Sequence, residues 1–448
     1  MLRLILLGLF PILIPSNAEP ETNSFTPVEE VFPIHWKADM GNVSFRNNIL
    51  LTPNEIIIGS NGKYFMDYNF VDEKAGVYKI NRKTGKQNSH FGNDAIGDMD
   101  VNGILQWGNR LYISNDNEEL VCTTPEGKII WSKPASGDIE HEPVLIEHPT
   151  NPLIVYATET GEVKAVRPEN GETVWSYYTP DFSGWKPKDN RFIFKVKSYF
   201  NNTHSFYRKP IKADLNTDGI PDLIYLTFSG DTYAINGVNG KLLWRLKDIK
   251  LSNIEKIPFA KGNDFLLAVG WKRNASDTNN EYFLLRIKSN GQHSIIHPLE
   301  EQYFSSLNYY FHKDEILINT ADHLITIKNN RITDITKRAL MAEQKYSWSD
   351  ESSMINRNHD DMLFSNNSFK YKNYGECIIN LVQHDNLNYS KGFIEIIALT
   401  NKKIVDRLML PESSEMQPLI GDINQDGQKD LLINCKDEYL YCYNLGVK

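Results

Sequence analysis

Two nine-residue stretches of the chain combine the residue types and the spacing of a calcium-binding loop. Both follow the pattern D-x-N-x-D-G-x-x-D, so side-chain oxygens recur at positions 1, 3, 5 and 9. Ca²⁺ takes about six to eight oxygen ligands at about 2.3–2.6 Å, and alternate side chains of a short loop can converge on one ion. With a backbone carbonyl at position 7, the predicted ligands are Asp214, Asn216, Asp218, Ile220 and Asp222 in the first loop, and Asp422, Asn424, Asp426, Gln428 and Asp430 in the second.

The alternative interpretation of these stretches is a turn without metal, because Asn, Asp and Gly dominate turns. Two copies with the same ligand positions favour two structural Ca²⁺ sites, each with a dissociation constant of about 10⁻⁴ to 10⁻³ M. The last acidic ligand stands at position 9 and no helical pattern flanks either loop, which excludes an EF-hand. A third stretch, residues 98–103, begins in the same way but has Gln106 at position 9, and we interpret it as a decayed loop.

The segments that must position these loops are predicted to be strands. From residue 45 onward, short runs of β-branched and aromatic residues alternate between the two faces of a strand and are separated by Gly, Asn and Asp turns. Residues 56–60, 111–114 and 223–226 are typical of buried strands, and a polar turn and a second strand follow each of them. The sequence therefore predicts an all-β fold.

A turn glycine followed four residues later by a tryptophan recurs within residues 126–131, 170–175 and 239–244. Glycine supplies a positive φ in a tight turn between antiparallel strands, and a tryptophan on the next strand can fill the seam against a neighbouring sheet. Weaker copies of the phrase have Ser89 and Ile295 where the tryptophan would stand. This pattern indicates a repeat of four-stranded antiparallel blades.

The repeats predict a β-propeller of eight blades, with seven or nine blades as alternatives. The predicted blades are residues 45–91, 97–133, 138–177, 205–246, 254–296, 303–337, 350–409 and 415–445. A ring of sheets has to close its last blade, and residues 34–39 are predicted to be the strand that completes it.

The glycine–tryptophan phrases resemble the quinoprotein-type, or PQQ-like, propeller repeat, in which each blade ends in a turn glycine and a docking tryptophan. The resemblance implies a single propeller domain over residues 33–448. The two aspartate-rich loops are similar to those of the FG-GAP or VCBS propeller repeat, where such a loop joins two strands of one blade. The apolar runs at residues 223–225 and 431–433 fit that placement.

The N-terminus has the features of a secretory signal. Arg3 precedes an apolar run that ends in small and polar residues, which predicts a cleavable signal peptide over residues 1–18 and a linker over residues 19–32. The apolar run is about a dozen residues long and contains Pro11, whereas a membrane-spanning helix needs about 20 residues. We therefore expect a secreted, periplasmic or cell-surface protein without a transmembrane segment in the mature chain.

Composition and motifs exclude several function classes. The net charge of −9 with interspersed signs offers no cationic face for nucleic acid. Cysteine spacing is unlike that of a zinc or redox motif, and Cys435 and Cys442 are interpreted either as buried free thiols or as a bridged pair. The sequence contains no zinc-protease, serine-hydrolase or phosphate-loop signature, and His141 beside Glu142 is interpreted as a solvated turn.

The longest interruption of the repeat, residues 185–209, is basic and aromatic. Such a segment can bind an acidic glycan or a protein, while the alternative is that its aromatic residues pack on the adjacent blade. The predicted ligand-binding residues are Trp185, Arg191, Lys195 and Lys197.

These features together predict a non-catalytic binding or assembly scaffold with structural calcium, because the resemblance includes periplasmic propellers that assist outer-membrane protein assembly. The expected partner is a protein or a glycan. The alternative is a carbohydrate-active enzyme similar to calcium-loop polysaccharide lyases. The quinoprotein resemblance also implies a quinone-dependent dehydrogenase, a less favoured reading because the sequence lacks the vicinal cysteines on which that family's quinone often stacks.

Overall fold

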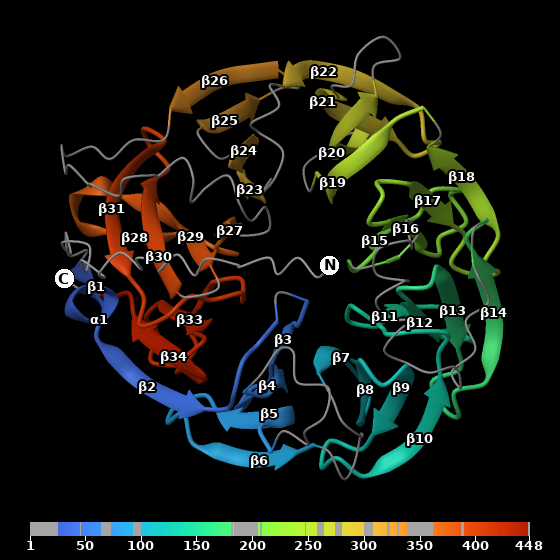
Figure 1. Ribbon diagram of the computed structural model, residues 1–448, viewed down its shortest axis with the longest axis horizontal. Helices are drawn as coiled ribbons and strands as arrows, with labels where there is room; N and C mark the ends of the chain where they lie inside the picture. Colours follow the sequence, from blue (N-terminus) through green and yellow to red (C-terminus); the bar gives the residue numbers. More distant parts are fainter. Residues whose placement is uncertain are drawn as a thin grey trace, which may run out of the picture.

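The computed structural model shows a closed ring of β-sheets (Figure 1). Within its described residues, the secondary structure other than strands is the short helix α1 (Val28–Val31) and the 3₁₀ helix η2 (Lys372–Tyr374). The structure describes residues 26–446 except residues 45, 64–72, 93–99, 181, 183–204, 207, 247, 258–263, 274–279, 300–307, 320–322, 329–330, 338–361 and 387–388.

Eight sheets form the ring, and the strands of blades 1 to 6 run outward in sequence order from the centre to the rim, whereas N-terminal strands lie outermost in blades 7 and 8 (Figure 1). Blades 1 to 4 consist of β3 (Ile49–Leu51), β4 (Glu55–Asn61), β5 (Ala75–Asn81) and β6 (Gln87–Phe91); β7 (Val101–Trp107), β8 (Arg110–Asn115), β9 (Glu119–Thr123) and β10 (Ile129–Pro134); β11 (Val144–Ile146), β12 (Leu153–Ala157), β13 (Glu162–Val166) and β14 (Thr173–Tyr178); and β15 (Ile211–Ala213), β16 (Asp222–Leu226), β17 (Thr232–Ile235) and β18 (Leu242–Leu246).

The second half of the ring repeats this arrangement, and the sheet of blade 7 has two additional short strands. Blades 5 to 8 consist of β19 (Lys250–Lys256), β20 (Asp264–Arg273), β21 (Asn280–Lys288) and β22 (His293–Leu299); β23 (Asn308–His312), β24 (Glu315–Asn319), β25 (His323–Lys328) and β26 (Arg331–Lys337); β27 (Met362–Phe364), β28 (Phe369–Lys370), β29 (Glu376–Asn386), β30 (Tyr389–Ala398) and β31 (Lys403–Met409); and β32 (Leu419–Gly421), β33 (Asp430–Asn434), β34 (Tyr439–Asn444) and β2 (Ile34–Asp39). A short strand near the N-terminus, β1 (Thr26–Pro27), lies parallel to β31 on the outside of blade 7.

The prediction of an eight-bladed, all-β propeller is confirmed by these sheets. Seven of the eight blades start later than predicted, as in blade 3, which begins at Val144 and not at residue 138, whereas blade 5 starts earlier, at Lys250 and not at residue 254. The reason is that the chain crosses one face of the ring between blades before the innermost strand starts. Polar connections of this kind look like the beginning of a strand when only residue types are considered.

The core of the protein is distributed over the seams between blades. Eight hydrophobic clusters of buried residues each combine side chains from two neighbouring blades, and together they occupy all eight seams. The second strand of a blade is buried on both faces, as in β12 and β16, whose five residues each are all buried. Each blade is therefore stabilised by its two neighbours, as expected of a repeat architecture.

Tryptophan side chains dock across the seams, each against a turn glycine of the next blade. The indole Nε1 of Trp175 donates a hydrogen bond to the carbonyl of Gly237 at 3.2 Å, and its ring covers Gly240 in the turn of the next blade. Trp131 covers Gly171 in the same way. At blade 1, where the phrase has no tryptophan, Phe91 takes this place and covers Gly127. The tryptophan phrase is thus an inter-blade contact, which the sequence pattern alone did not assign to a partner.

Ring closure joins the two ends of the described chain. β2 pairs antiparallel with β34 and becomes the outermost strand of blade 8. From it, Trp36 donates a hydrogen bond to the carbonyl of Arg82 at 2.8 Å and covers Gly85 in blade 1. The same docking contact that links blades 2, 3 and 4 therefore also links blade 8 to blade 1.

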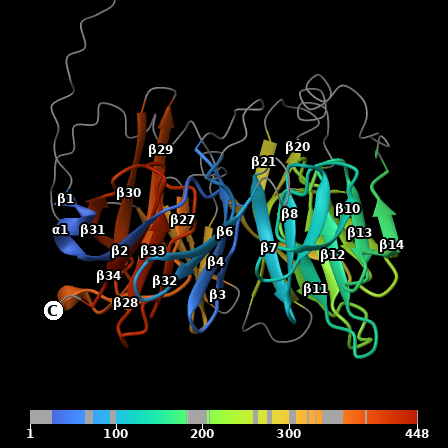
Figure 2. The same cartoon turned by 90° about the horizontal axis from the view of Figure 1, so that it is seen from below.

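The ring has two distinct faces, seen edge-on in Figure 2. We call face A the side on which the innermost strand of each blade begins, and face B the side on which it ends. Since neighbouring strands are antiparallel, connections between blades and the turns between second and third strands lie on face A. Loops between first and second strands, and the docking turns between third and fourth strands, lie on face B. Among the described residues, no helix is long and apolar enough to cross a membrane.

Candidate functional site

The two aspartate-rich loops occupy equivalent positions on face B. Residues 214–221 connect β15 to β16 in blade 4, and residues 422–429 connect β32 to β33 in blade 8. The ninth residue of each loop, Asp222 or Asp430, is the first residue of the second strand and is fully buried. Each loop therefore joins the first and second strands of its blade, as the sequence predicts.

Both loops have the same backbone geometry. A non-glycine residue with positive φ, Thr217 at 64° or Gln425 at 63°, stands at position 4 of each loop, directly before the aspartate at position 5. The backbone amide of Gly219 then donates to Asp214 Oδ2 at 3.0 Å, and that of Gly427 donates to Asp422 Oδ2 at 3.2 Å. This tight turn directs the side chains at positions 1, 3 and 5 toward the inside of each loop.

The first loop is anchored through its buried ninth residue. Asp222 Oδ2 accepts from the amide of Leu215 at 2.9 Å, and its Oδ1 accepts from Gly237 at 3.0 Å and from the Asn236 amide at 3.1 Å. Burial raises the pKa of Asp222, although the backbone hydrogen bonds act in the opposite direction. Because Gly237 also accepts the Trp175 indole, the loop is coupled to the docking turn of its own blade.

The second loop lies at the seam that closes the ring. Arg82 of blade 1 donates from Nη2 to the carbonyl of Asp422 at 2.7 Å and from Nε to that of Ile423 at 2.8 Å. His35 of the closing strand β2 lies 3.2 Å from Asp430 Oδ1. This loop therefore contacts both the closing strand and the first blade, and its conformation bears on ring closure.

The donor set of each loop fits a hard cation in chemical type. Three carboxylates, one amide oxygen and a carbonyl at position 7 are all oxygen donors, as Ca²⁺ prefers. In the structure, loop amides share these oxygens: Asp218 Oδ1 accepts from Ile220 at 2.8 Å, and Asp426 Oδ1 accepts from Gln428 at 2.8 Å. The geometry is compatible with both the calcium loop and the turn without metal.

The four residues of the predicted ligand-binding insertion, Trp185, Arg191, Lys195 and Lys197, lie outside the described residues. At the edge of this segment, Lys209 forms an ion pair with Glu142 on face A. Glu142 belongs to the connection between blades 2 and 3.

Face A carries a carboxylate cluster that the sequence reasoning missed. Asp116, Asp138 and Glu140 each place an oxygen within 4.8 Å of the other two. Arg46 Nη1 lies 2.7 Å from Glu140 Oε2 and brings a positive charge to the cluster. Desolvation and the neighbouring Asp116 hold the pKa of Asp100 well above its ordinary value. Residues 98–103 were the part of this region that the sequence pattern pointed out. The carboxylates near Asp100 lie in other connections, so spacing within a loop could not reveal them.

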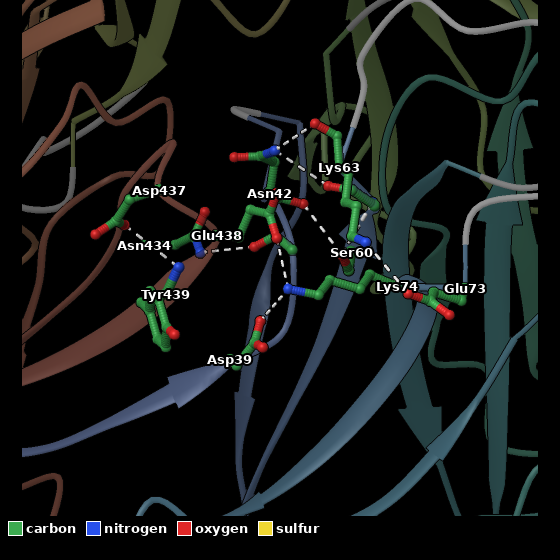
Figure 3. Close-up of polar contacts among 12 residues, drawn as sticks. Asp39, Asn42, Ser60, Lys63, Glu73, Lys74, Asn434, Asp437, Glu438 and Tyr439 are labelled. Carbon is green, nitrogen blue, oxygen red and sulfur yellow. Dashed lines mark hydrogen bonds and ion pairs between the residues drawn. The ribbon is translucent and has the colours of Figure 1, made fainter.

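A polar latch on face A supports the closed ring (Figure 3). Lys74, at the start of β5, forms ion pairs with Asp39 at the end of β2 and with Glu438 in the β33–β34 turn. Burial alone would lower the pKa of Lys74, but hydrogen bonds to both carboxylates outweigh it, so the pKa lies above its ordinary value. Beside it, Asn434 accepts from the amide of Val43 at 2.9 Å. The latch ties the first blade to the last through side chains as well as through the sheet.

Two further groups test interpretations made from the sequence. The interpretation of His141 as a solvated turn was wrong: the residue is 1% exposed, and burial lowers its pKa to about 4. Its Nδ1 lies 2.8 Å from the carbonyl of Glu142, so the neutral ring is held by the backbone. All four cysteines, including Cys435 and Cys442, are buried and free, which confirms the reading as buried thiols.

The blades, the docking tryptophans and the closing strand define the class: this protein is an eight-bladed β-propeller of four-stranded blades. A family model described as "Outer membrane protein assembly factor BamB" matches residues 73–257, from β5 in blade 1 to the end of β19 in blade 5. No curated protein matches the sequence.

Solved structures agree with this class at the level of the fold. Sqt1 of Saccharomyces cerevisiae has a TM-score of 0.57 at 10% identity, covering 91% of this chain and 98% of its own. BamB from Moraxella catarrhalis has a TM-score of 0.51 at 11% identity, covering 92% and 100%. The quinohemoprotein alcohol dehydrogenase from Comamonas testosteroni has a TM-score of 0.52 at 8% identity, covering 93% and 77%. At such identities the likeness concerns the fold alone.

Proposed function

We propose that this protein is a non-catalytic binding and assembly scaffold of the cell envelope, acting on protein partners, with structural calcium in its two aspartate-rich loops. The observation that supports the scaffold most directly is the match of residues 73–257 to a family model described as an outer membrane protein assembly factor. A propeller of this kind offers two broad faces and a rim for contact. A signal peptide over residues 1–18 would take the chain to that compartment, in line with the sequence pattern.

Face A is the proposed contact face. On it, Phe228 stands in the turn between β16 and β17 and is 74% exposed, the highest value among the large apolar side chains of the described residues. Aromatic side chains are enriched among the residues that contribute most to protein interfaces. Face B is occupied by the docking turns and the two loops, which serve the stability of the ring.

A cross-linking experiment in intact cells tests the scaffold. A photoreactive amino acid at Phe228 on face A is expected to capture one defined protein partner during affinity purification. The matched control is the same amino acid at Val238, which is 38% exposed and lies in the β17–β18 turn on face B.

Cross-linking of one protein from Phe228 but not from Val238 supports the scaffold and its face. Capture of glycan in place of protein would instead favour the carbohydrate-active alternative. Absence of any cross-linked partner from positions on both faces and the rim would contradict the scaffold.

The calcium proposal rests on the repeated loop geometry. The two loops are 208 positions apart in sequence, from Asp214 to Asp422, yet share their oxygen positions, their positive-φ residue and their buried ninth aspartate. An ion in the first loop would fix the β15–β16 connection. An ion in the second would fix the loop that Arg82 and His35 contact at the closing seam.

Removal of calcium is expected to lower stability. With calcium at ten times the dissociation constant, binding at one site stabilises the folded state by about 1.4 kcal/mol, so excess chelator should cost about twice that. Asp218→Asn and Asp426→Asn should each lose about half of the chelator effect, because Asn keeps the backbone contacts but removes a charged ligand. Asp248→Asn, an exposed aspartate outside the loops, is the control. Thermal melting with and without chelator is the measurement, and a melting temperature that chelator does not change would refute the proposal.

A further inference from the structure

We propose that Phe228, Arg245 and Lys250 on face A form a docking surface for an acidic segment of a protein partner, one that carries an apolar side chain beside a carboxylate. We call these three residues the aromatic–basic patch. The inference deepens the proposed scaffold function and rests on it for the choice of face. It adds the chemistry of the segment that the face would recognise.

The patch combines side chains of two neighbouring blades (Figure 1). Phe228 stands in the turn between β16 and β17, Arg245 lies near the end of β18, and Lys250 begins β19 of blade 5. A single carboxylate, that of Asp231 in the same turn as Phe228, contacts both cations. Its Oδ1 lies 3.1 Å from Arg245 Nη2, and its Oδ2 lies 2.5 Å from Lys250 Nζ. The turn therefore gathers one aromatic ring and two cations at the seam between blades 4 and 5.

The carboxylate of this arrangement is buried and the cations are more exposed. The side chain of Asp231 is 4% exposed, whereas those of Arg245 and Lys250 are 26% and 34% exposed. Burial alone would raise the pKa of Asp231, but hydrogen bonds from Lys250 and Arg245 outweigh it, so the pKa lies below its ordinary value. Asp231 is therefore a charged carboxylate, and it balances one of the two cations.

The charge and the donors that remain favour an anionic partner group. Residues 245–250 contain three basic residues and one acidic residue, so together with Asp231 their formal charge is +1, in a chain of net charge −9. Within the part of the chain that the structure describes, Lys250 Nζ contacts Asp231 alone and Arg245 donates a hydrogen bond only from Nη2. Ammonium and guanidinium groups carry further N–H donors, and a carboxylate is their strongest common acceptor. The patch thus complements acidic side chains.

The acceptors of the turn favour a protein segment over a glycan. Ser229 Oγ lies 3.1 Å from Asp231 Oδ2 and 3.2 Å from Thr227 Oγ1, and both oxygens of Asp231 face cations. Sugar hydroxyls are donors as well as acceptors, so a glycan needs side-chain acceptors that this turn already uses within itself. The ring of Phe228, 74% exposed, offers an apolar contact in their place. Aromatic anchors next to arginine are typical of the residues that contribute most to protein interfaces.

The first test lets the full chain select its own ligand. Short random peptides displayed on phage are selected on the folded protein, and peptides that combine Asp or Glu with Phe, Leu or Trp are expected to be enriched. A fluorescent synthetic copy of the most enriched peptide is then used as the probe, and its binding is measured by fluorescence anisotropy at low ionic strength.

Substitutions in the patch should change the affinity for this peptide in opposite directions. Phe228→Ala is expected to weaken binding by about tenfold, because it removes the apolar anchor. Lys250→Gln should weaken binding by about fivefold, whereas Asp231→Asn should strengthen it by about threefold, because it removes the carboxylate that competes for both cations. Lys241→Gln, at an exposed lysine in the face B turn of the same blade, is the control and should leave the affinity unchanged.

The opposite signs separate docking from a merely structural ion pair. If the charges only held blades 4 and 5 together, Lys250→Gln and Asp231→Asn would both weaken binding, and thermal melting of each variant shows whether the chain is folded. Selection of no peptide, or of peptides without acidic residues, would overturn the inference. Unchanged affinity in Lys250→Gln, or weaker binding by folded Asp231→Asn protein, would also overturn it.

Two further outcomes distinguish this inference from its neighbours. Displacement of the peptide by an acidic oligosaccharide such as oligogalacturonate would overturn the protein segment in favour of a glycan. Capture of a protein from Phe228 in cells does not depend on the acidity of the captured segment. The scaffold proposal therefore stands or falls by the cross-linking experiment, and the chemistry of the patch by the peptide measurements.

Discussion

A chain that starts at residue 45 is expected to be poorly soluble or associated, whereas a chain that starts at residue 26 should remain a soluble monomer. The shorter chain lacks β2, so the outermost ladder of blade 8 is unpaired along β34. An exposed strand edge is a template for association with other chains. Trp36, 6% exposed in the native ring, is lost together with its hydrogen bond to Arg82.

The point substitution Trp36→Ala separates packing from strand pairing. Truncation of a buried tryptophan typically costs about 3–5 kcal/mol, and Trp36 packs in the cluster that joins blades 8 and 1. Ile34→Ala on the same strand is the control, because Ile34 is 42% exposed and should change stability by about 0.5 kcal/mol. Urea unfolding of both variants and gel filtration of the two truncated chains are the measurements. A folded, monomeric chain from residue 45 would show that β2 is dispensable for closure.

Gly240→Ala is expected to be among the most damaging single substitutions in blade 4. Gly240 has φ of +71°, where a non-glycine residue is strained by about 1–3 kcal/mol. The added Cβ would lie 2.5 Å from Cε3 of Trp175, so the docked indole would also have to move. Overpacking of this kind typically costs a further 1–3 kcal/mol, for a total of about 2–6 kcal/mol.

The chain offers a matched control for the backbone part of this effect. Gly219 has a similar φ of +83°, but a Cβ there would meet no atom within 4 Å. The free energy of unfolding of Gly219→Ala should therefore fall only by the added backbone strain of about 1–3 kcal/mol. Both variants are measured by urea unfolding in chelator, which removes any influence of calcium. Equal losses in the two variants would mean that the docked tryptophan contributes little to the seam.

The fold class and the number of blades could be predicted because each blade repeats local signals. Period-two alternation marks the strands, and the glycine–tryptophan spacing marks the turn between the third and fourth strands. Such signals depend on residues that are close in sequence. The spacing of Gly171 and Trp175 was visible for that reason, whereas the partner of each tryptophan was not, since Trp175 covers Gly240 at the next blade.

The candidate sites differ in the same way, because some consist of residues close in sequence and others of residues that only the fold brings together. The residues of the two aspartate-rich loops were named from sequence because a nine-residue loop carries its own oxygens, and the structure places each loop between the first two strands of a blade. The face A cluster was not predicted, because Asp116 and Glu140 stand in different connections and come together only when blades 2 and 3 pack side by side.

Sequence by itself determined the strand pattern, the blade repeat and the oxygen-rich loops, since alternation, turn chemistry and short-range spacing are local properties of the chain. Tertiary structure alone decided which residues meet across the seams and at the closing point. There, Lys74 joins Asp39 to Glu438, residues 399 positions apart in the sequence. Contacts of this kind depend on how one blade is rotated against the next, and that rotation is set by the packing of two buried surfaces and not by either segment alone.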